Sequence, residues 1–246
     1  ILAEETLTLG APKTGLLATT AADYVGRLRV APEIGLLPRR ETSELQLGQE
    51  EDFYGFPPPR PAGGHKGTFG HVGIMAGSLG YHGAAVLAAH GAARAQPGLV
   101  TLLTPDDVYV PVASQLQSVM VQPLVPGEIT IKSITSLLVG PGLASDRLSD
   151  DLKTTTDNMW HESSVLMVVD ASALDWLTAG AVPAKSIRVI TPHPGEAARL
   201  LDATVAEVQA DRVEALQALS AKFGNCWVVL KGRHTLVGQA EGSVFA

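Results

Sequence analysis

The segment Thr191-Pro192-His193-Pro194-Gly195-Glu196 combines an imidazole and a carboxylate on a rigid stretch of backbone. The flanking prolines remove backbone freedom and so hold His193 in a preset direction. We predict a helix over residues 196–201, and the dipole at its N-terminus favours the Glu196 carboxylate. The alternative is that Glu196 only caps this helix and that His193 only packs. Because rigid loops that carry polar residues are usually functional, the segment is a candidate site.

A second candidate, Lys231-Gly232-Arg233-His234-Thr235, follows the apolar run 226–230. A cation together with free peptide N–H groups suits the phosphates of a nucleotide. A solvated hairpin has the same composition and is an equal alternative. The segment 65–70 is similarly basic and glycine-rich, although Lys66 could equally face solvent.

Two glycine-rich turns and an aspartate complete the candidates. Residues 77–83 contain three glycines before a predicted helix, and free N–H groups there could hold an anion or admit a ligand to the backbone. A flexible turn is the equal alternative, and the spacing of a P-loop is absent. Gly140-Pro141-Gly142 predicts a tight turn with exposed amides, whereas Asp170 either contacts a ligand or metal or caps the helix after it.

These candidates follow apolar stretches that predict the strands of a sheet. The predicted strands are residues 71–76, 99–104, 136–140, 165–170, 187–191 and 226–231. Several are apolar on both faces, as expected for a parallel sheet that is covered by helices. The predicted helices between them are residues 84–95, 149–158 and 205–223. This alternation predicts an α/β domain with a mostly parallel sheet, and ligands of such domains bind beyond the C-terminal ends of the strands.

Residues 1–64 are organised differently from the rest of the chain. Short strands are predicted at residues 6–10 and 26–30, and residues 41–64 change from acidic to proline- and glycine-rich. That composition is typical of a linker between two units.

The composition argues against several classes of function. The 246 residues carry 18 Lys and Arg against 25 Asp and Glu, a formal net charge of −7, which argues against binding nucleic acid through a basic face. The single cysteine, Cys226, excludes a disulfide framework and a cysteine-based zinc site, and no metal-ligand cluster is visible. No stretch is long and apolar enough to span a bilayer, and the first residues show no signal-peptide core. We therefore expect a cytoplasmic protein without a membrane partner.

Seven short motifs occur in order along the chain, namely His65-Lys66-Gly67-x-x-Gly70-His71, Ala76-Gly77-Ser78, His82-Gly83-Ala84-Ala85, Gly140-Pro141-Gly142, Asp170-Ala171-x-Ala173-Leu174, Thr191-Pro192-His193-Pro194-Gly195-Glu196 and Lys231-Gly232-x-x-Thr235. This series resembles the NAD(P)H-hydrate dehydratase family, whose members have a ribokinase-like three-layer fold. Residues 1–37 resemble the last strands of the NAD(P)H-hydrate epimerase domain, which precedes the dehydratase in bacterial bifunctional repair enzymes. The resemblance implies an epimerase tail at residues 1–40, a linker at 41–64 and an ADP-dependent dehydratase domain at 65–246.

The resemblance also implies an activity and a set of site residues. In the family, ADP (ATP in eukaryotic relatives) phosphorylates the hydroxyl that water adds to the nicotinamide ring of NADH or NADPH, and phosphate then leaves. Carried over to this chain, the residues that contact the hydrated cofactor are Ala84, Gly142 and His193. Those that line the adenine-nucleotide phosphates are Lys231, Gly232, Arg233, His234 and Thr235. Mg²⁺ would enter only with these phosphates, and a base is needed near the hydroxyl.

The sequence departs from the family pattern at several positions. Ser172 stands where Asp is usual, Ala144 where Gly is usual, and Gln96-Pro97-Gly98 where Gly-Ala-Gly is more usual. The family's Gly-Thr-Gly-Asp segment, which supplies the catalytic base and an anion hole, is expected some tens of residues after Lys231. No Gly-x-Gly-Asp occurs before the last residue, Ala246. We therefore expect a C-terminally truncated fold, a catalytic Asp beyond Ala246, and no dehydration by this chain alone.

Three other functions stay open. A small-molecule kinase of the same fold, acting on a vitamin-precursor alcohol, would share most of the motifs. A non-catalytic nucleotide-binding module would bind ADP or a dinucleotide without turnover, and a purely structural fragment would bind neither. The choice between ADP and ATP, the preference for NADH or NADPH, and assembly into a homo-oligomer are also left open.

Overall fold

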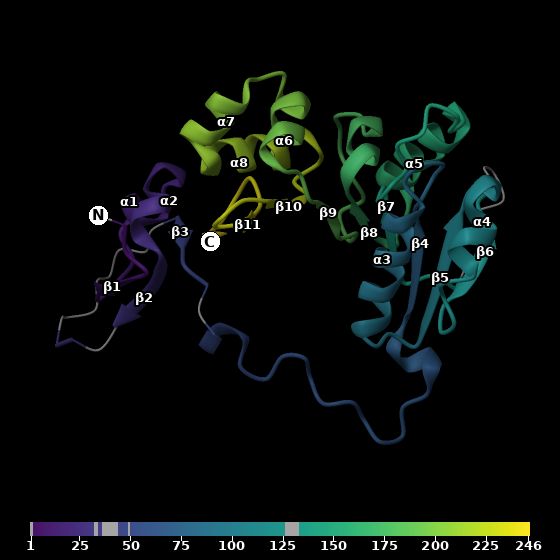
Figure 1. Cartoon of the computed structure of the whole chain (residues 1–246), viewed down its shortest axis with the longest axis horizontal. Coiled ribbons are helices and arrows are strands. Elements are labelled where there is room, and N and C mark those ends of the chain that lie inside the picture. Colours follow the sequence, from purple (N-terminus) through teal and green to yellow (C-terminus); the bar gives the residue numbers. More distant parts are fainter. Residues whose placement is uncertain (1, 32–33, 36–43, 49, 126–132) are drawn as a thin grey trace.

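The computed structural model spans the chain and describes all of it except residues 1, 32–33, 36–43, 49 and 126–132. A ten-stranded sheet forms its centre (Figure 1). In spatial order the strands are β3 (Leu45–Gln46), β12 (Val244–Phe245), β11 (Leu236–Gly238), β10 (Trp227–Leu230), β9 (Arg188–Ile190), β8 (Leu166–Val169), β7 (Ser136–Val139), β4 (His71–Met75), β5 (Leu99–Thr104) and β6 (Met120–Pro123). The neighbours from β10 to β6 are all parallel, whereas β11 is antiparallel to both β10 and β12. The predicted α/β fold with a mostly parallel sheet is therefore confirmed.

Successive strand residues point to opposite faces of the sheet and enter two different apolar cores. In β4, Ile74 packs into a core with α3 (His82–Arg94) and α4 (Asp106–Ala113), whereas Met75 belongs to the other core. That larger core lies against α5 (Asp150–Glu162) and α6 (Pro194–Leu201) and contains the fully buried Trp160. The strands that are apolar on both faces thus reflect burial on both sides, as the sequence pattern predicts.

The single helix predicted over residues 205–223 is in fact two helices. α7 (Val205–Ala210) and α8 (Arg212–Lys222) meet at Asp211, whose backbone is extended. The Asp211 carboxylate accepts a hydrogen bond from the Glu214 N–H at 2.9 Å and so caps α8. The apolar period continues through this break, which is why the pattern alone predicts one helix.

The N-terminal segment forms a small unit beside the end of the large sheet (Figure 1). β1 (Glu5–Leu9) and β2 (Arg27–Ala31) pair in parallel as a separate two-stranded sheet. α1 (Thr14–Leu17) and α2 (Ala22–Val25) connect them. The remaining short 3-10 helices are η1 (Thr19–Ala21), η2 (Glu50–Phe53), η3 (Lys66–Phe69) and η4 (Ala171–Trp176). None of the helices in the described residues is long and apolar enough to cross a membrane.

Candidate functional site

The candidate segments that follow strands lie in a row along the C-terminal edge of the sheet, whereas residues 65–70 precede β4 and lie at its N-terminal end. β10, β9, β8, β7 and β4 are consecutive neighbours and run parallel, so their C-terminal ends share one edge. The turns and residues that follow these strands are the ones singled out in the sequence. With strands about 4.8 Å apart, four spacings make the row about 19 Å long. A row of this length suits an extended ligand or two ligands side by side.

Three side chains from neighbouring strand ends form a polar cluster. The Lys231 ammonium lies 2.9 Å from Oδ1 of Asp170, and the Thr191 hydroxyl donates to the same oxygen at 2.6 Å. The Lys231 N–H also donates to the Pro192 carbonyl at 2.8 Å, which ties the β10 end to the β9 end. Asp170 stands at the N-cap position of η4, but these contacts commit its Oδ1 to Lys231 and Thr191.

Asp170 is held ionised by its partners. Burial raises the pKa of its carboxyl, but the hydrogen bonds from Thr191 and Lys231 and the Lys231 charge outweigh burial, so the pKa lies below its ordinary value of 3.8. The Lys231 charge is consequently balanced within the protein in this arrangement.

His193 is the N-cap residue of α6. Its Nδ1 accepts from the N–H groups of Gly195 (3.0 Å) and Glu196 (3.3 Å), and Glu196 accepts from the His193 N–H at 2.7 Å. This reciprocal pair is a capping box, and Pro194 occupies the first helical position, where a missing N–H costs nothing. Glu196 therefore caps α6, as the alternative interpretation expects. Because Nδ1 accepts, the neutral ring carries its proton on Nε2, and the side chain is 52% exposed.

Glu196 links His193 to Lys231. Its side chain is only 9% exposed, and its two oxygens lie 3.5 Å from Nε2 of His193 and 3.6 Å from the Lys231 ammonium. Two carboxylates therefore surround one ammonium. A ligand phosphate can therefore bind the Lys231 ammonium only by competing with the carboxylates of Asp170 and Glu196.

Ala84 and Gly142 meet at the other end of the row. Gly142 has φ +71°, and a Cβ added there would lie 2.6 Å from the Tyr81 carbonyl oxygen and 2.8 Å from Cβ of Ala84. The buried Ser78 hydroxyl fixes this turn. It donates to the Gly142 carbonyl at 2.7 Å and accepts hydrogen bonds from the N–H groups of Ala144 and Ser145. Gly140 links this turn to the polar cluster of Lys231, Asp170 and Thr191. A Cβ added to Gly140 would lie 1.8 Å from the Asp170 carbonyl oxygen.

The loop 231–235 is anchored by two arginines. Arg233 donates to the carbonyls of Ala22 and Gly26 (2.7 Å for Gly26) and so turns its guanidinium toward the N-terminal segment. Arg212, the first residue of α8, donates a hydrogen bond to the His234 carbonyl at 2.8 Å. Burial, and then the charges of Arg233 and Arg212, lower the pKa of His234. Sequence reasoning missed Arg212, although a cation in the first turn of a helix is unusual enough to be a signal.

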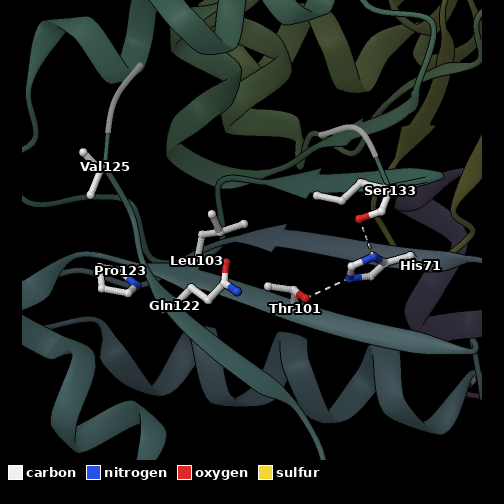
Figure 2. Close-up of a pocket in the computed structure, with 8 residues that line it drawn as sticks. His71, Thr101, Leu103, Gln122, Pro123, Val125 and Ser133 are labelled. Atoms are coloured by element: carbon white, nitrogen blue, oxygen red, sulfur yellow. Dashed lines mark hydrogen bonds between the residues drawn. The ribbon is translucent and has the colours of Figure 1, made fainter. Parts of the chain in front are cut away.

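A separate cavity of about 460 Å³ lies on the face of β4, β5 and β6 (Figure 2). Its polar lining includes His71, whose ring nitrogens lie 3.2 Å from the Ser133 hydroxyl and 2.8 Å from the Thr101 hydroxyl. Gln122 and Leu103 also line it. None of the predicted site residues lines it.

The parallel sheet and the row of turns at its C-terminal edge define a ribokinase-like α/β domain. A solved ribokinase-like superfamily protein of Enterococcus faecalis has the same fold, with a TM-score of 0.69 at 22% identity, covering 85% of this chain and 73% of that one. The family described as NAD(P)H-hydrate dehydratase matches residues 72–246, and the chain belongs to this family. The resemblance expected from the motif order is thus confirmed.

Named relatives agree with this assignment. The bifunctional NAD(P)H-hydrate repair enzyme of Moorella thermoacetica is 34% identical over an alignment of 268 positions. The alignment covers 100% of this chain and 49% of that enzyme. The ADP-dependent (S)-NAD(P)H-hydrate dehydratase of Neisseria meningitidis is 35% identical, covering 74% of this chain and 62% of that protein. A Bacillus subtilis ADP/ATP-dependent NAD(P)H-hydrate dehydratase, co-crystallised with ATP and Mg²⁺, matches with a TM-score of 0.65 at 28% identity, covering 76% of this chain and 67% of that one. This chain spans about half the length of the bifunctional enzyme.

Proposed function

We propose that this chain carries the ligand-binding part of an ADP-dependent NAD(P)H-hydrate dehydratase and binds hydrated NADH or NADPH together with ADP. The observation that carries the proposal is the row of turns at the C-terminal edge. It joins the residues carried over for the dinucleotide to those carried over for the nucleotide phosphates. An enzyme that transfers a phosphoryl group between two nucleotides needs such an elongated, two-part site.

The dinucleotide fits the part of the row that holds Gly142, Ala84 and His193. Gly142 packs against Ala84 and the Tyr81 carbonyl with no room for a side chain, so these two turns meet as one backbone surface that a ligand can contact. The half-exposed His193 carries its proton on Nε2, 3.5 Å from Glu196, and this N–H can donate to a ligand oxygen in place of the carboxylate. Glu196 holds the imidazole in this orientation through the capping box.

The nucleotide phosphates fit the loop 231–235. No protein acceptor in the described residues takes the N–H groups of Gly232, Arg233 and His234. Backbone N–H groups that converge in a turn are suited to binding an anion. Among the described residues no group of three or more His, Cys, Asp or Glu could hold a metal ion, so Mg²⁺ would arrive with the phosphates and neutralise part of their charge.

Binding and turnover are separable in this proposal. The carboxylates of the described cluster are engaged, Asp170 with Lys231 and Glu196 in the capping box. The family's catalytic Asp follows a Gly-Thr-Gly motif that is absent from the 246 residues. We therefore propose that the chain binds both ligands but does not complete the reaction alone. Residues 1–40 as an epimerase tail, residues 41–64 as a linker, and a cytoplasmic location belong to the same proposal.

Calorimetric titration tests the proposal. Wild-type chain should bind ADP with Mg²⁺, and separately hydrated NADH, each saturably, and Lys231→Met should weaken ADP binding alone. Lys153→Met is the matched control, because Lys153 is a half-exposed lysine whose ion-pair partner among the described residues is Asp150, three positions earlier in α5. Absence of binding for both ligands would overturn the proposal. Phosphorylation of a thiazole or pyrimidine alcohol would instead support the kinase, and phosphate release from ADP with hydrated NADH would overturn only the expected lack of turnover.

A further inference from the structure

Arg212 occupies an electrostatically unfavourable position. It is the first residue of α8, where the positive end of the helix dipole disfavours a cation. Burial also lowers the pKa of its guanidinium. No carboxylate in the described part of the chain forms an ion pair with it. Because the helix dipole and burial both destabilise the charged guanidinium, hydrogen bonds to uncharged groups must stabilise it instead.

Those contacts are the carbonyl groups of the loop 231–235 and of the residue before it. The Arg212 guanidinium donates to the carbonyls of His234 at 2.8 Å, Leu230 at 3.0 Å and Lys231 at 3.3 Å. Gly232 lies directly against this group, since an added Cβ would come within 2.6 Å of Nη2. The planar fork of an arginine can reach several carbonyls at once, whereas a lysine ammonium is a single point donor.

These contacts set the direction of the peptide N–H groups in the loop. In a trans peptide the C=O and the following N–H point in opposite directions. Because the carbonyls of Lys231 and His234 point at Arg212, the N–H groups of Gly232 and Thr235 point away from it. The Gly232 N–H has no protein acceptor among the described residues. The half-buried Arg212 guanidinium thus turns the N–H groups of Gly232 and Thr235 away from itself without occupying the space on their far side.

We propose that Arg212 is the positioning residue of the nucleotide site: it holds the loop 231–235 with its N–H groups toward the phosphates and adds positive charge beneath them without touching the ligand. This inference rests on the proposed nucleotide site. It explains why an arginine stands in the first turn of α8 and why the next loop residue after Lys231 is a glycine.

The test compares ADP binding by the 246-residue wild type, Arg212→Ala and Arg212→Lys, with Arg199→Ala as the control. Arg199 is an exposed arginine of α6 whose partner is Asp175. Because hydrogen bonds to charged groups are lost, Arg212→Ala should weaken ADP binding about 10- to 100-fold, and Arg199→Ala should leave it unchanged. Arg212→Lys should resemble Arg212→Ala, and added guanidinium ion should partly restore ADP binding to Arg212→Ala.

Two further readouts separate positioning from general structural damage. Adenosine, which lacks phosphates, should bind wild type and Arg212→Ala equally. Hydrogen exchange of residues 230–236 should rise in Arg212→Ala while exchange of β9 stays unchanged. The inference is overturned if ADP binding changes less than twofold, if adenosine binding falls as much as ADP binding, or if Arg212→Lys binds like wild type. If wild type binds no ADP, the proposed site fails, and the hydrogen-exchange result alone decides whether Arg212 organises the loop.

Discussion

Replacing Asp170 by Asn and Lys231 by Met, singly and together, measures the ion pair at the centre of the row. Asn keeps an oxygen for the Thr191 hydroxyl and removes only the charge of Asp170. Met keeps most of the volume of Lys231 and removes its ammonium. The double-mutant cycle therefore isolates the interaction between the two charges.

The structure sets the expected size of this coupling. At 2.9 Å the Coulomb energy is about 1.4 kcal/mol in water and about 6 kcal/mol at an effective dielectric constant of 20. The side chains of Lys231 and Asp170 are 40% and 30% exposed, so solvent screens much of the larger value. Desolvation of the two groups removes a further part. We expect a coupling of about 1–2 kcal/mol.

Urea unfolding of the wild type, the two single variants and the double variant near neutral pH gives the coupling free energy. The pair between Lys153 and Asp150, at 2.8 Å, is the matched control, because it has the same separation but an exposed aspartate. It should show no measurable coupling. Since the pKa of Asp170 is lowered, its contribution should persist above the ordinary value of 3.8 and disappear only as the pH falls through the lowered value. Equal coupling for the two pairs, or none for Asp170 and Lys231, would refute the argument from burial.

Three further predictions concern the turns and the thiol. Ser78→Ala should lower the free energy of unfolding in urea by about 2–4 kcal/mol, because a buried hydroxyl with three hydrogen bonds is lost. Gly142→Ala should cost about 3 kcal/mol in the same assay, from its φ of +71° and the clash with Tyr81. Gly83→Ala, with open space around it, should cost nothing. Burial raises the pKa of Cys226 to about 12, so a thiol reagent should fail to label the folded chain and label it fully in denaturant. Equal costs for Gly142→Ala and Gly83→Ala, no loss of stability in Ser78→Ala, or rapid native labelling would contradict these expectations.

The strands of the sheet could be predicted closely because burial on both faces dictates their composition. Residues 99–104 are predicted and observed as β5, and the other five predicted strands of this sheet differ from the observed ones by one residue at one or both ends. The remaining four strands of the sheet, β3, β6, β11 and β12, have no predicted range. By contrast, nothing in the pattern predicts α4, whose run of β-branched residues is interrupted by Pro111. It is a helix because Val108 and Val112, one turn apart, are buried in the core beside β5. Tertiary packing here overrides local preference.

The candidate site could be predicted in outline but not in detail. Parallel strands bring their C-terminal ends to one edge, so the motifs that follow them had to lie together. Which groups pair there depends on contacts between distant residues. Lys231 and Asp170 are 61 positions apart, and Arg233 and Ala22 are 211 apart. No local pattern reveals that Asp170 holds Lys231 or that the guanidinium of Arg233 turns to the N-terminal segment.

We propose that the row along the C-terminal edge is one site with two parts, one for each ligand. A crystal structure of the chain with ADP, Mg²⁺ and NADPH bound tests it most directly. We expect phosphate density within hydrogen-bond distance of the loop 231–235 and the nicotinamide ring beside Gly142 and His193. Density for either ligand in the cavity beside His71, or anywhere else away from this edge, would contradict it.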